Sequence, residues 1–157
     1  METEDILNRM RKYCSKKECC KVDVYKKIMD IALKENIDID PDEIIEKLCR
    51  ERYIDEMRYA KAFAHDKSVL QGWGDMKIKY QLRQKGIDPD IIMSAVEVID
   101  HDASKAKMKS LLEAYYNRLS GEEDEKFMKL LRFGIRRGFI FGQIKSVYDS
   151  IRSNKRD

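Results

Sequence analysis

Residues 58–87, RYAKAFAHDKSVLQGWGDMKIKYQLRQKGI, decide the fold. The stretch holds the only tryptophan, Trp73, between two glycines, and it ends in Lys-Gly-Ile. A similar Arg-Gly-Phe follows a second helical pattern at residues 137–139. Because glycine commonly adopts the left-handed conformation that closes a helix, Gly86 and Gly138 predict two equivalent helix ends. The sequence therefore predicts a helical unit that occurs more than once.

The composition favours long helices. The 157 residues include 7 Gly and 2 Pro, which is little material for the turns of a many-stranded sheet. With 43% apolar and 39% charged residues, the chain can form a core beneath a highly charged surface. Residues 74–85 alternate in polarity as a half-buried strand would. Ile78 and Leu82 are nevertheless one helical turn apart and no partner strand is evident, so we predict an all-α fold throughout.

The N-terminus and the cysteines indicate a reducing compartment. The first residues, METEDILNRM, are acidic where a secretory signal is basic, and no apolar run approaches the roughly 18 residues of a membrane span. We therefore expect a cytoplasmic protein with no membrane partner and reduced thiols. No Cys-x-x-Cys pair occurs, and only His65 and His101 could complete a zinc site, so we interpret the cysteines as partly buried structural residues. The cysteines are Cys14, Cys19, Cys20 and Cys49.

Helix starts recur with the same residues. Asp40-Pro41 and Asp88-Pro89 each place a capping carboxylate before a proline that suits the first helical position, and Asp55 starts another helix in the same way. Residues 85–99 align with residues 137–151 without a gap. This alignment places glycine on glycine and apolar residue on apolar residue. Ile140 stands where the other units have the capping aspartate, and Asp38 stands where they have glycine.

These repeats predict the domain organisation. We expect three tandem three-helix repeats at residues 1–53, 54–100 and 101–157, forming an elongated, curved helical array with one long open face. We also expect a monomer.

The chain lacks the constellations that carry catalysis. No nucleophile stands beside a base, and neither Gly-Trp-Gly nor the other glycines form a phosphate-binding loop. His65 is interpreted as a surface or packing residue. We therefore predict that the protein is not an enzyme and has no cofactor, no catalytic residue and no metal ligand.

Cations are the positive functional signal. They dominate residues 58–85, and residues 126–145 contain cations with no acid, whereas acids concentrate at residues 38–46 and 122–125. One such run is usually a solvated helix surface, but two at equivalent places in successive repeats favour a binding face for a partner or DNA. Trp73 has two interpretations, a plug between helices, which we prefer, and a contact residue at a repeat junction. The predicted contact residues are Arg58, Lys61, Lys67, Trp73, Lys77, Lys79, Arg83, Lys85, Arg132, Arg136, Arg137 and Lys145.

Several motifs in order resemble those of one family. RYAKAF followed by DK, GWG, KI and LRQKGI resembles the central signature of the RecX family of regulatory proteins, and RRGFIFGQI resembles its C-terminal repeat. The N-terminal CSKKECC region and the YID link are also similar. The resemblance implies three tandem three-helix repeats. It also implies a regulator that binds the RecA recombinase filament on single-stranded DNA and restrains its ATPase, strand-exchange and co-protease activities, and so recombination, DNA repair and the SOS response. It implies no catalytic residues and no required cofactor.

Two other functions remain open from the residues alone. The first is a direct DNA-binding protein that uses a basic helix as a groove reader, and the second is a helical adaptor for an unrelated protein partner. A steep salt dependence of binding would not separate these functions from filament regulation.

Overall fold

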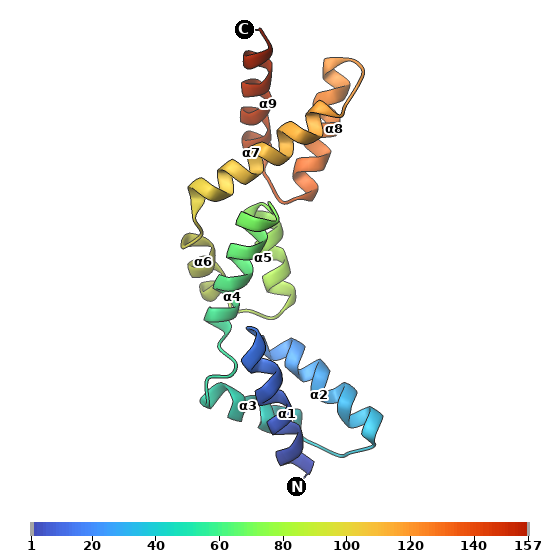
Figure 1. The fold of residues 1–157 in the computed structure, drawn as a ribbon, viewed down its shortest axis with the longest axis vertical. Helices are drawn as coiled ribbons and strands as arrows, with labels where there is room; N and C mark the ends of the chain where they lie inside the picture. Colours follow the sequence, from blue (N-terminus) through green and yellow to red (C-terminus); the bar gives the residue numbers. More distant parts are fainter. Residues whose placement is uncertain (1, 157) are drawn as a thin grey trace. The chain divides into compact units, whose positions relative to one another are not determined.

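The protein is all-α within residues 2–156, which the computed structural model describes (Figure 1). The ambiguous residues 74–85 form a helix, which confirms the prediction. The helix that starts near residue 56 ends in a π-helical segment before Gly72. The helices are α1 Glu2–Lys16, α2 Lys21–Glu35, α3 Pro41–Arg50, α4 Glu56–His65, the π-helix η1 Asp66–Leu70, α5 Asp75–Gln84, α6 Pro89–Glu97, α7 His101–Asn117, α8 Glu123–Arg136 and α9 Phe141–Arg156.

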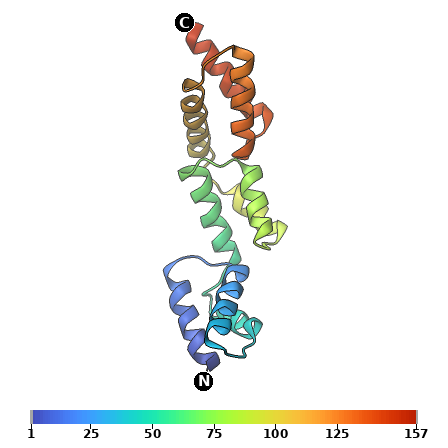
Figure 2. The ribbon, with the colours of Figure 1, turned by 90° about the vertical axis from the view of Figure 1, so that its right-hand side faces the viewer.

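The described residues pack as two compact units. One comprises residues 2–62 and 82–95, and the other comprises residues 63–81 and 96–156. Helices α4, α5 and α6 therefore contribute residues to both units. In the first unit α1, α2 and α3 pack on one another, and in the second α7, α8 and α9 do so, with η1 against α7 (Figure 2). The repeat boundaries at residues 53 and 100 stay a prediction from the sequence.

The first unit has its core among α1, α2 and α3. Apolar residues at helical spacing along α1 and α2 face α3, and removing them from water is the main stabilising contribution. Cys14 and Cys19 belong to this core, Cys20 is fully buried and Cys49 is half-buried, and all four are free thiols. The main core residues are Ile6, Leu7, Met10, Val24, Ile28, Ile44, Leu48 and Ile54.

The second unit has its own core among α7, α8 and α9. Gly134 lies in the last turn of α8 and is buried. A Cβ there would lie 2.5 Å from Cδ1 of Ile144, so glycine permits the close packing of α8 on α9. The core residues are Met108, Leu112, Tyr116, Leu130, Phe139, Ile144, Val147 and Ile151.

A carboxylate network joins the ends of this second core. The hydroxyls of Tyr116 and Tyr148 donate hydrogen bonds of 2.8 and 3.1 Å to Glu123, whose carboxylate also lies 3.1 Å from Arg152. The hydrogen bond from Tyr116 is the main reason that the pKa of Glu123 lies below its ordinary value. The charged form of Glu123 therefore stabilises the fold.

The aligned repeats have equivalent structures. Gly86 and Gly138 both have positive φ angles, +72° and +97°, which confirms the predicted helix ends. Every apolar pair in the alignment is buried in both copies. The pairs are Ile87 and Phe139, Ile92 and Ile144, Ala95 and Val147, and Ile99 and Ile151.

The helix starts also agree with the predicted caps. The carboxylates of Asp40 and Asp88 each accept a hydrogen bond of 3.1 Å from the backbone N–H two residues ahead. Asp55 accepts one of 3.0 Å from the backbone N–H of Arg58. These bonds satisfy N–H groups that lack a partner inside the helix.

The two departures from the repeat pattern have structural explanations. At Ile140 the backbone N–H donates to Oε1 of Gln143 at 3.0 Å, so the cap is supplied from inside the helix by half of a capping box. In the first repeat the left-handed residue is Asn36, with φ of 53°, two positions before Asp38. Asparagine tolerates this conformation better than most residues, so the first repeat has the same kind of helix end and a longer loop.

The described helices include none that is both long and apolar enough to cross a membrane.

Candidate functional site

The Trp73 loop is held in the second unit by backbone hydrogen bonds. After η1, the N–H of Trp73 donates to the carbonyl of Lys67 at 2.7 Å, and the N–H of Gly74 donates to the carbonyl of Arg137 at 2.7 Å. The N–H of Met76 donates to the carbonyl of Gly138 at 3.2 Å. The start of α5 is thereby fastened to the turn between α8 and α9.

Glycine at position 74 is required by this close approach. A Cβ there would lie 2.3 Å from the carbonyl carbon and oxygen of Gly138. A Cβ at Gly72 would likewise lie 2.0 Å from Cδ1 of Leu111 on α7. Both glycines that flank Trp73 therefore permit close packing. The motif GWG thus encodes the docking of one loop on two other segments of the same unit.

Trp73 lies among cations. The Nζ atoms of Lys67 and Lys77 are 5.0 and 4.1 Å from the centroid of its ring, and the ring of Phe63 meets it edge-on at a centroid distance of 6.0 Å. Cation–π contacts of this kind contribute about 0.5–2 kcal/mol each. Trp73 is half-buried. It packs on Phe63, as a plug would, and it also orients two lysines at the surface, so its role lies between the two interpretations.

Arg137 adds a third positive charge. Its guanidinium donates hydrogen bonds to the carbonyls of Gln71 and Gly72, and it lies 5.7 Å from the ring centroid of Phe133. Phe133 in turn stacks on Tyr115 at a centroid distance of 4.1 Å. Arg137 therefore has a structural role in holding the loop. Its hydrogen-bond acceptors are uncharged carbonyl oxygens, so they leave its positive charge unpaired.

The three cations together form an electropositive cluster, which we call the Trp73 cluster: Lys67, Lys77 and Arg137 around Trp73. Burial lowers the pKa of Lys77, and the charges of Arg137 and Lys67 lower it further. Among the described residues no carboxylate forms an ion pair with Lys77 or Arg137, and Asp66 is 3.9 Å from Lys67. Like charges held this close favour the approach of an anion.

The other predicted cations of residues 58–87 do not join this cluster. Arg58, Lys61, Arg83 and Lys85 belong to the first unit. Arg58 is 2.7 Å from Glu18, and Lys85 is 2.7 Å from Asp23, so both charges are paired inside that unit. Lys61 and Arg83 are exposed, and Lys79, in the second unit, is half-buried.

The C-terminal cations also separate into different environments. Arg132 and Arg136 are exposed on α8, and Arg136 donates to the carbonyl of Arg132 at 3.5 Å. Lys145 on α9 is 2.6 Å from Asp149. Of the cations in residues 126–145, only Arg137 thus belongs to the Trp73 cluster.

Comparison with known proteins assigns the family. A family model described as the second three-helix domain of RecX matches residues 55–96, which include Trp73 and Lys77. Regulatory protein RecX of Clostridium tetani is 30% identical over 69% of this chain, and that of Clostridium botulinum is 34% identical over 60%. This chain belongs to the RecX family. The RecX of Yersinia enterocolitica is 26% identical over 71% of the chain and 68% of its own length.

Solved structures show the same fold. A crystal structure of regulatory protein RecX covers 94% of this chain and 71% of its own, with a TM-score of 0.80 and 22% identity. The RecX of Lactobacillus salivarius covers 96% of both chains, with a TM-score of 0.76 and 23% identity. The matched parts span 50% and 45% of the two clostridial relatives, so the chain covers about half the length of these curated proteins. Each of these two relatives is described as a regulatory protein.

Some residues of the site were missed at the sequence level. Arg137 is positioned by the stacked rings of Phe133 and Tyr115 and by the carbonyls of Gln71 and Gly72. The two carbonyls lie 66 and 65 residues before Arg137 in the chain. Nothing in the spacing of these residues indicates the contact. The one sequence signal for this contact is the pair of glycines that flanks Trp73, because glycine allows another segment to approach the backbone closely.

Proposed function

We propose that this chain binds the RecA recombinase filament on single-stranded DNA and inhibits its ATPase, strand-exchange and co-protease activities. Membership of the RecX family supports a regulatory role. Recombination, DNA repair and the SOS response are the processes that such inhibition would modulate, and they imply a cytoplasmic location.

The Trp73 cluster is the observation that carries the proposal for a site. Lys67 and Lys77 lie over the ring of Trp73, and Arg137 is held on the backbone just before that ring. Among the described residues the only carboxylate that forms an ion pair with any of the three is Asp66, at 3.9 Å from Lys67. Burial is the main cause of the lowered pKa of Lys77, and repulsion from Arg137 and Lys67 adds to it; a phosphate group of the DNA strand would offset this repulsion. Binding of these cations to the strand would also release its counterions. The exposed cations Lys61, Arg83, Arg132 and Arg136 and the half-buried Lys79 would add attraction that depends on salt.

Binding of the chain to the phosphates of the single strand would explain how it inhibits the recombinase. A protein bound along the filament, with its cations on phosphates, obstructs access of a second strand and the closure of recombinase subunits on which ATP hydrolysis depends. Arg58, Lys85 and Lys145 contribute least in this proposal, because each already has a carboxylate within 2.7 Å.

A titration of recombinase ATP hydrolysis tests the proposal. Increasing amounts of the chain are added to RecA assembled on single-stranded DNA, and we expect hydrolysis to fall to a low plateau. The variant Lys77→Gln should need a higher concentration for the same inhibition, whereas Lys34→Gln, an exposed lysine of the first unit, should behave as wild type. Unchanged hydrolysis at saturating protein would refute the proposed function.

Binding to naked nucleic acid separates the alternatives. We expect weaker binding to bare single-stranded DNA than to the recombinase-coated strand. Sequence-specific binding to duplex DNA without recombinase would instead identify a direct DNA-binding protein. Stable association with another purified protein and none with the filament would identify a helical adaptor.

A further inference from the structure

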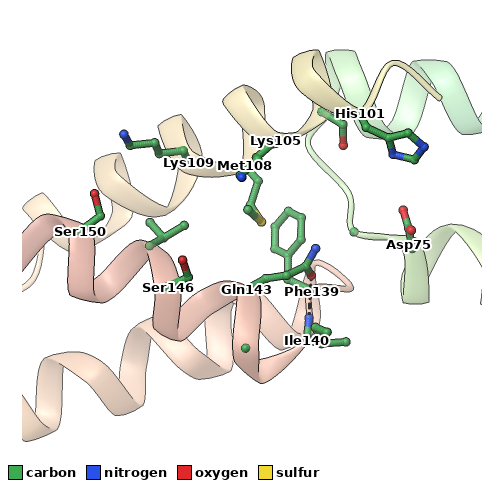
Figure 3. Close-up of a pocket in the computed structure, with 14 residues that line it drawn as sticks. Asp75, His101, Lys105, Met108, Lys109, Phe139, Ile140, Gln143, Ser146 and Ser150 are labelled. Carbon is green, nitrogen blue, oxygen red and sulfur yellow. Dashed lines mark hydrogen bonds between the residues drawn. The ribbon is translucent and has the colours of Figure 1, made fainter.

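A groove in the second unit lies outside the Trp73 cluster. It has a volume of about 660 Å³ and runs between α7 and α9, with Gly74 and Asp75 from the start of α5 also lining it. Figure 3 shows His101 and Asp75 toward one end of the groove and Lys109 and Ser150 toward the other. All of its lining residues belong to the same compact unit.

The floor of the groove is apolar. Met108, Phe139 and Val147 line it while keeping only 5–6% of their surface exposed, so their packed side chains form a firm base. Ile140 stands at the edge with 55% of its surface exposed. Burying an apolar side chain of a partner against these groups would be favourable, because it removes from water the apolar surface of that side chain and of Ile140.

The walls of the groove are polar and carry positive charge. Lys105 and Lys109 lie one turn apart on α7, about 6 Å along the helix axis. The wall from α9 presents the neutral groups of Gln143, Ser146 and Ser150. Lys109 forms an ion pair of 3.9 Å with Glu113, which does not line the groove, and Asp75 is the one carboxylate among the described lining residues. The groove therefore complements an acidic ligand.

These features favour a protein segment over a nucleic acid. Single-stranded nucleic acids are held by stacking of bases on exposed aromatic rings and by arginine. Among the described lining residues there is no tryptophan, tyrosine or arginine, the ring of Phe139 is only 5% exposed, and the one exposed ring, the imidazole of His101, stands toward one end of the groove (Figure 3). An apolar floor beneath two lysines and three hydrogen-bonding side chains instead suits a peptide with an apolar anchor and carboxylates one helical turn apart.

We propose that the groove between α7 and α9 binds an acidic peptide segment that inserts one apolar side chain onto Met108, Phe139 and Val147 and places its carboxylates on Lys105 and Lys109. The inference rests on the proposed function, since the segment is assigned to the protein component of the filament. The groove then contacts protein, while the Trp73 cluster contacts phosphate.

Two variants of the full chain test the groove from different directions. Gly142 lines the groove, and a Cβ at that position would meet nothing within 4 Å, so Gly142→Trp should fill the opening and leave the fold intact. The double variant Lys105→Glu, Lys109→Glu reverses the charge of one wall. Lys129→Glu is the matched control, because Lys129 is exposed on α8 outside the groove.

Binding is measured by fluorescence anisotropy on RecA filaments and on bare single-stranded DNA, with helical content checked by circular dichroism. We expect both groove variants to bind filaments at least about tenfold more weakly, and the control to stay within about twofold of wild type. Gly142→Trp should bind bare DNA as wild type does. Filament binding like wild type in both variants would overturn the inference, and an equal loss on bare DNA would show that the groove takes nucleic acid.

A crosslinking experiment identifies the occupant and does not depend on loss of binding. A photoreactive benzoylphenylalanine replaces Ser146, an exposed lining residue, and the chain is irradiated on assembled filaments. Crosslinks should map to an acidic segment of the recombinase that contains an apolar residue, whereas crosslinks to DNA, or none, would contradict the inference. If crosslinks form to DNA or do not form, but the wild-type chain still inhibits ATP hydrolysis, the peptide-binding role of the groove is refuted and the proposed function is not.

Discussion

Replacing Gly74 by alanine should destabilise the second unit strongly. The new Cβ would lie 2.3 Å from the carbonyl carbon of Gly138, whereas ordinary contacts begin at 3.4 Å, so the two segments must separate by about 1 Å. That displacement would stretch the 2.7 Å bond from the N–H of Gly74 to the carbonyl of Arg137 beyond hydrogen-bonding range, and it would also weaken the bond from Met76.

The magnitude follows from these effects. Two backbone hydrogen bonds contribute about 0.5–1.5 kcal/mol each, and overpacking costs about 1–3 kcal/mol, so we expect a destabilisation of about 2–6 kcal/mol. This is a large part of the roughly 5–15 kcal/mol that stabilises a typical domain. The substitution should also displace the Trp73 loop from Arg137, and under the proposed function it should reduce inhibition of the recombinase.

Chemical denaturation measures this effect directly. Trp73 is the only tryptophan, so its fluorescence reports unfolding of the loop next to the substitution, while circular dichroism reports helices throughout the chain. The control is Gly142→Ala, which adds its methyl group to open space and should be neutral or slightly stabilising. If the free energy of unfolding of Gly74→Ala lies within about 0.5 kcal/mol of the wild-type value, the two segments do not approach as closely as described.

Three further predictions address charge, pH and backbone conformation. Replacing both Lys67 and Lys77 by glutamine should reduce the slope of log affinity against log salt for single-stranded DNA by about 1.4, or about 0.7 for each lysine that no longer neutralises a phosphate, which an anisotropy titration at several salt concentrations would measure. The folded pKa of Glu123 is lowered mainly by Tyr116, so its stabilisation is complete above its ordinary pKa of about 4.3 and disappears as pH falls through the lower folded value. Glu123→Gln should therefore differ from wild type in urea unfolding at neutral pH and converge with it in strong acid. Gly86→Val should lower stability by about 1–3 kcal/mol in a thermal melt, because φ at this position is +72°, and an unchanged melt would contradict the left-handed helix end.

Much of the fold was predictable because its signals are local. Helix periodicity, the capping carboxylates of Asp40, Asp55 and Asp88, and the glycines that end helices act within a few residues of their own position. The equivalence of Gly86 and Gly138 followed from alignment alone, and both adopt the conformation that the alignment predicts. The cap at Ile140 was less accessible, since the side chain that supplies it is an ordinary glutamine three residues later.

The binding residues were only partly predictable because charge has no preferred spacing. The sequence indicated twelve contact residues from two cationic runs, and nothing in those runs distinguishes a paired cation from an unpaired one. Glu18 neutralises Arg58 from 40 residues away and Asp23 neutralises Lys85 from 62 residues away, contacts that exist only after the helices pack. The lysines of the α7 and α9 groove lay outside both runs.

The sequence by itself determined the all-α fold, the repeated helix ends and the resemblance to the RecX family, because each depends on residue types at fixed short separations. Only the tertiary structure decided that Lys67 and Lys77 lie over Trp73 and that Arg137 binds the loop beside it, while Arg58 and Lys85 form ion pairs elsewhere. The physical reason is that the electrostatic environment of a side chain depends on distances in space. The close approach of Gly74 and Gly138, which sets those distances in the second unit, brings together segments that are 64 residues apart (138 − 74) in the chain.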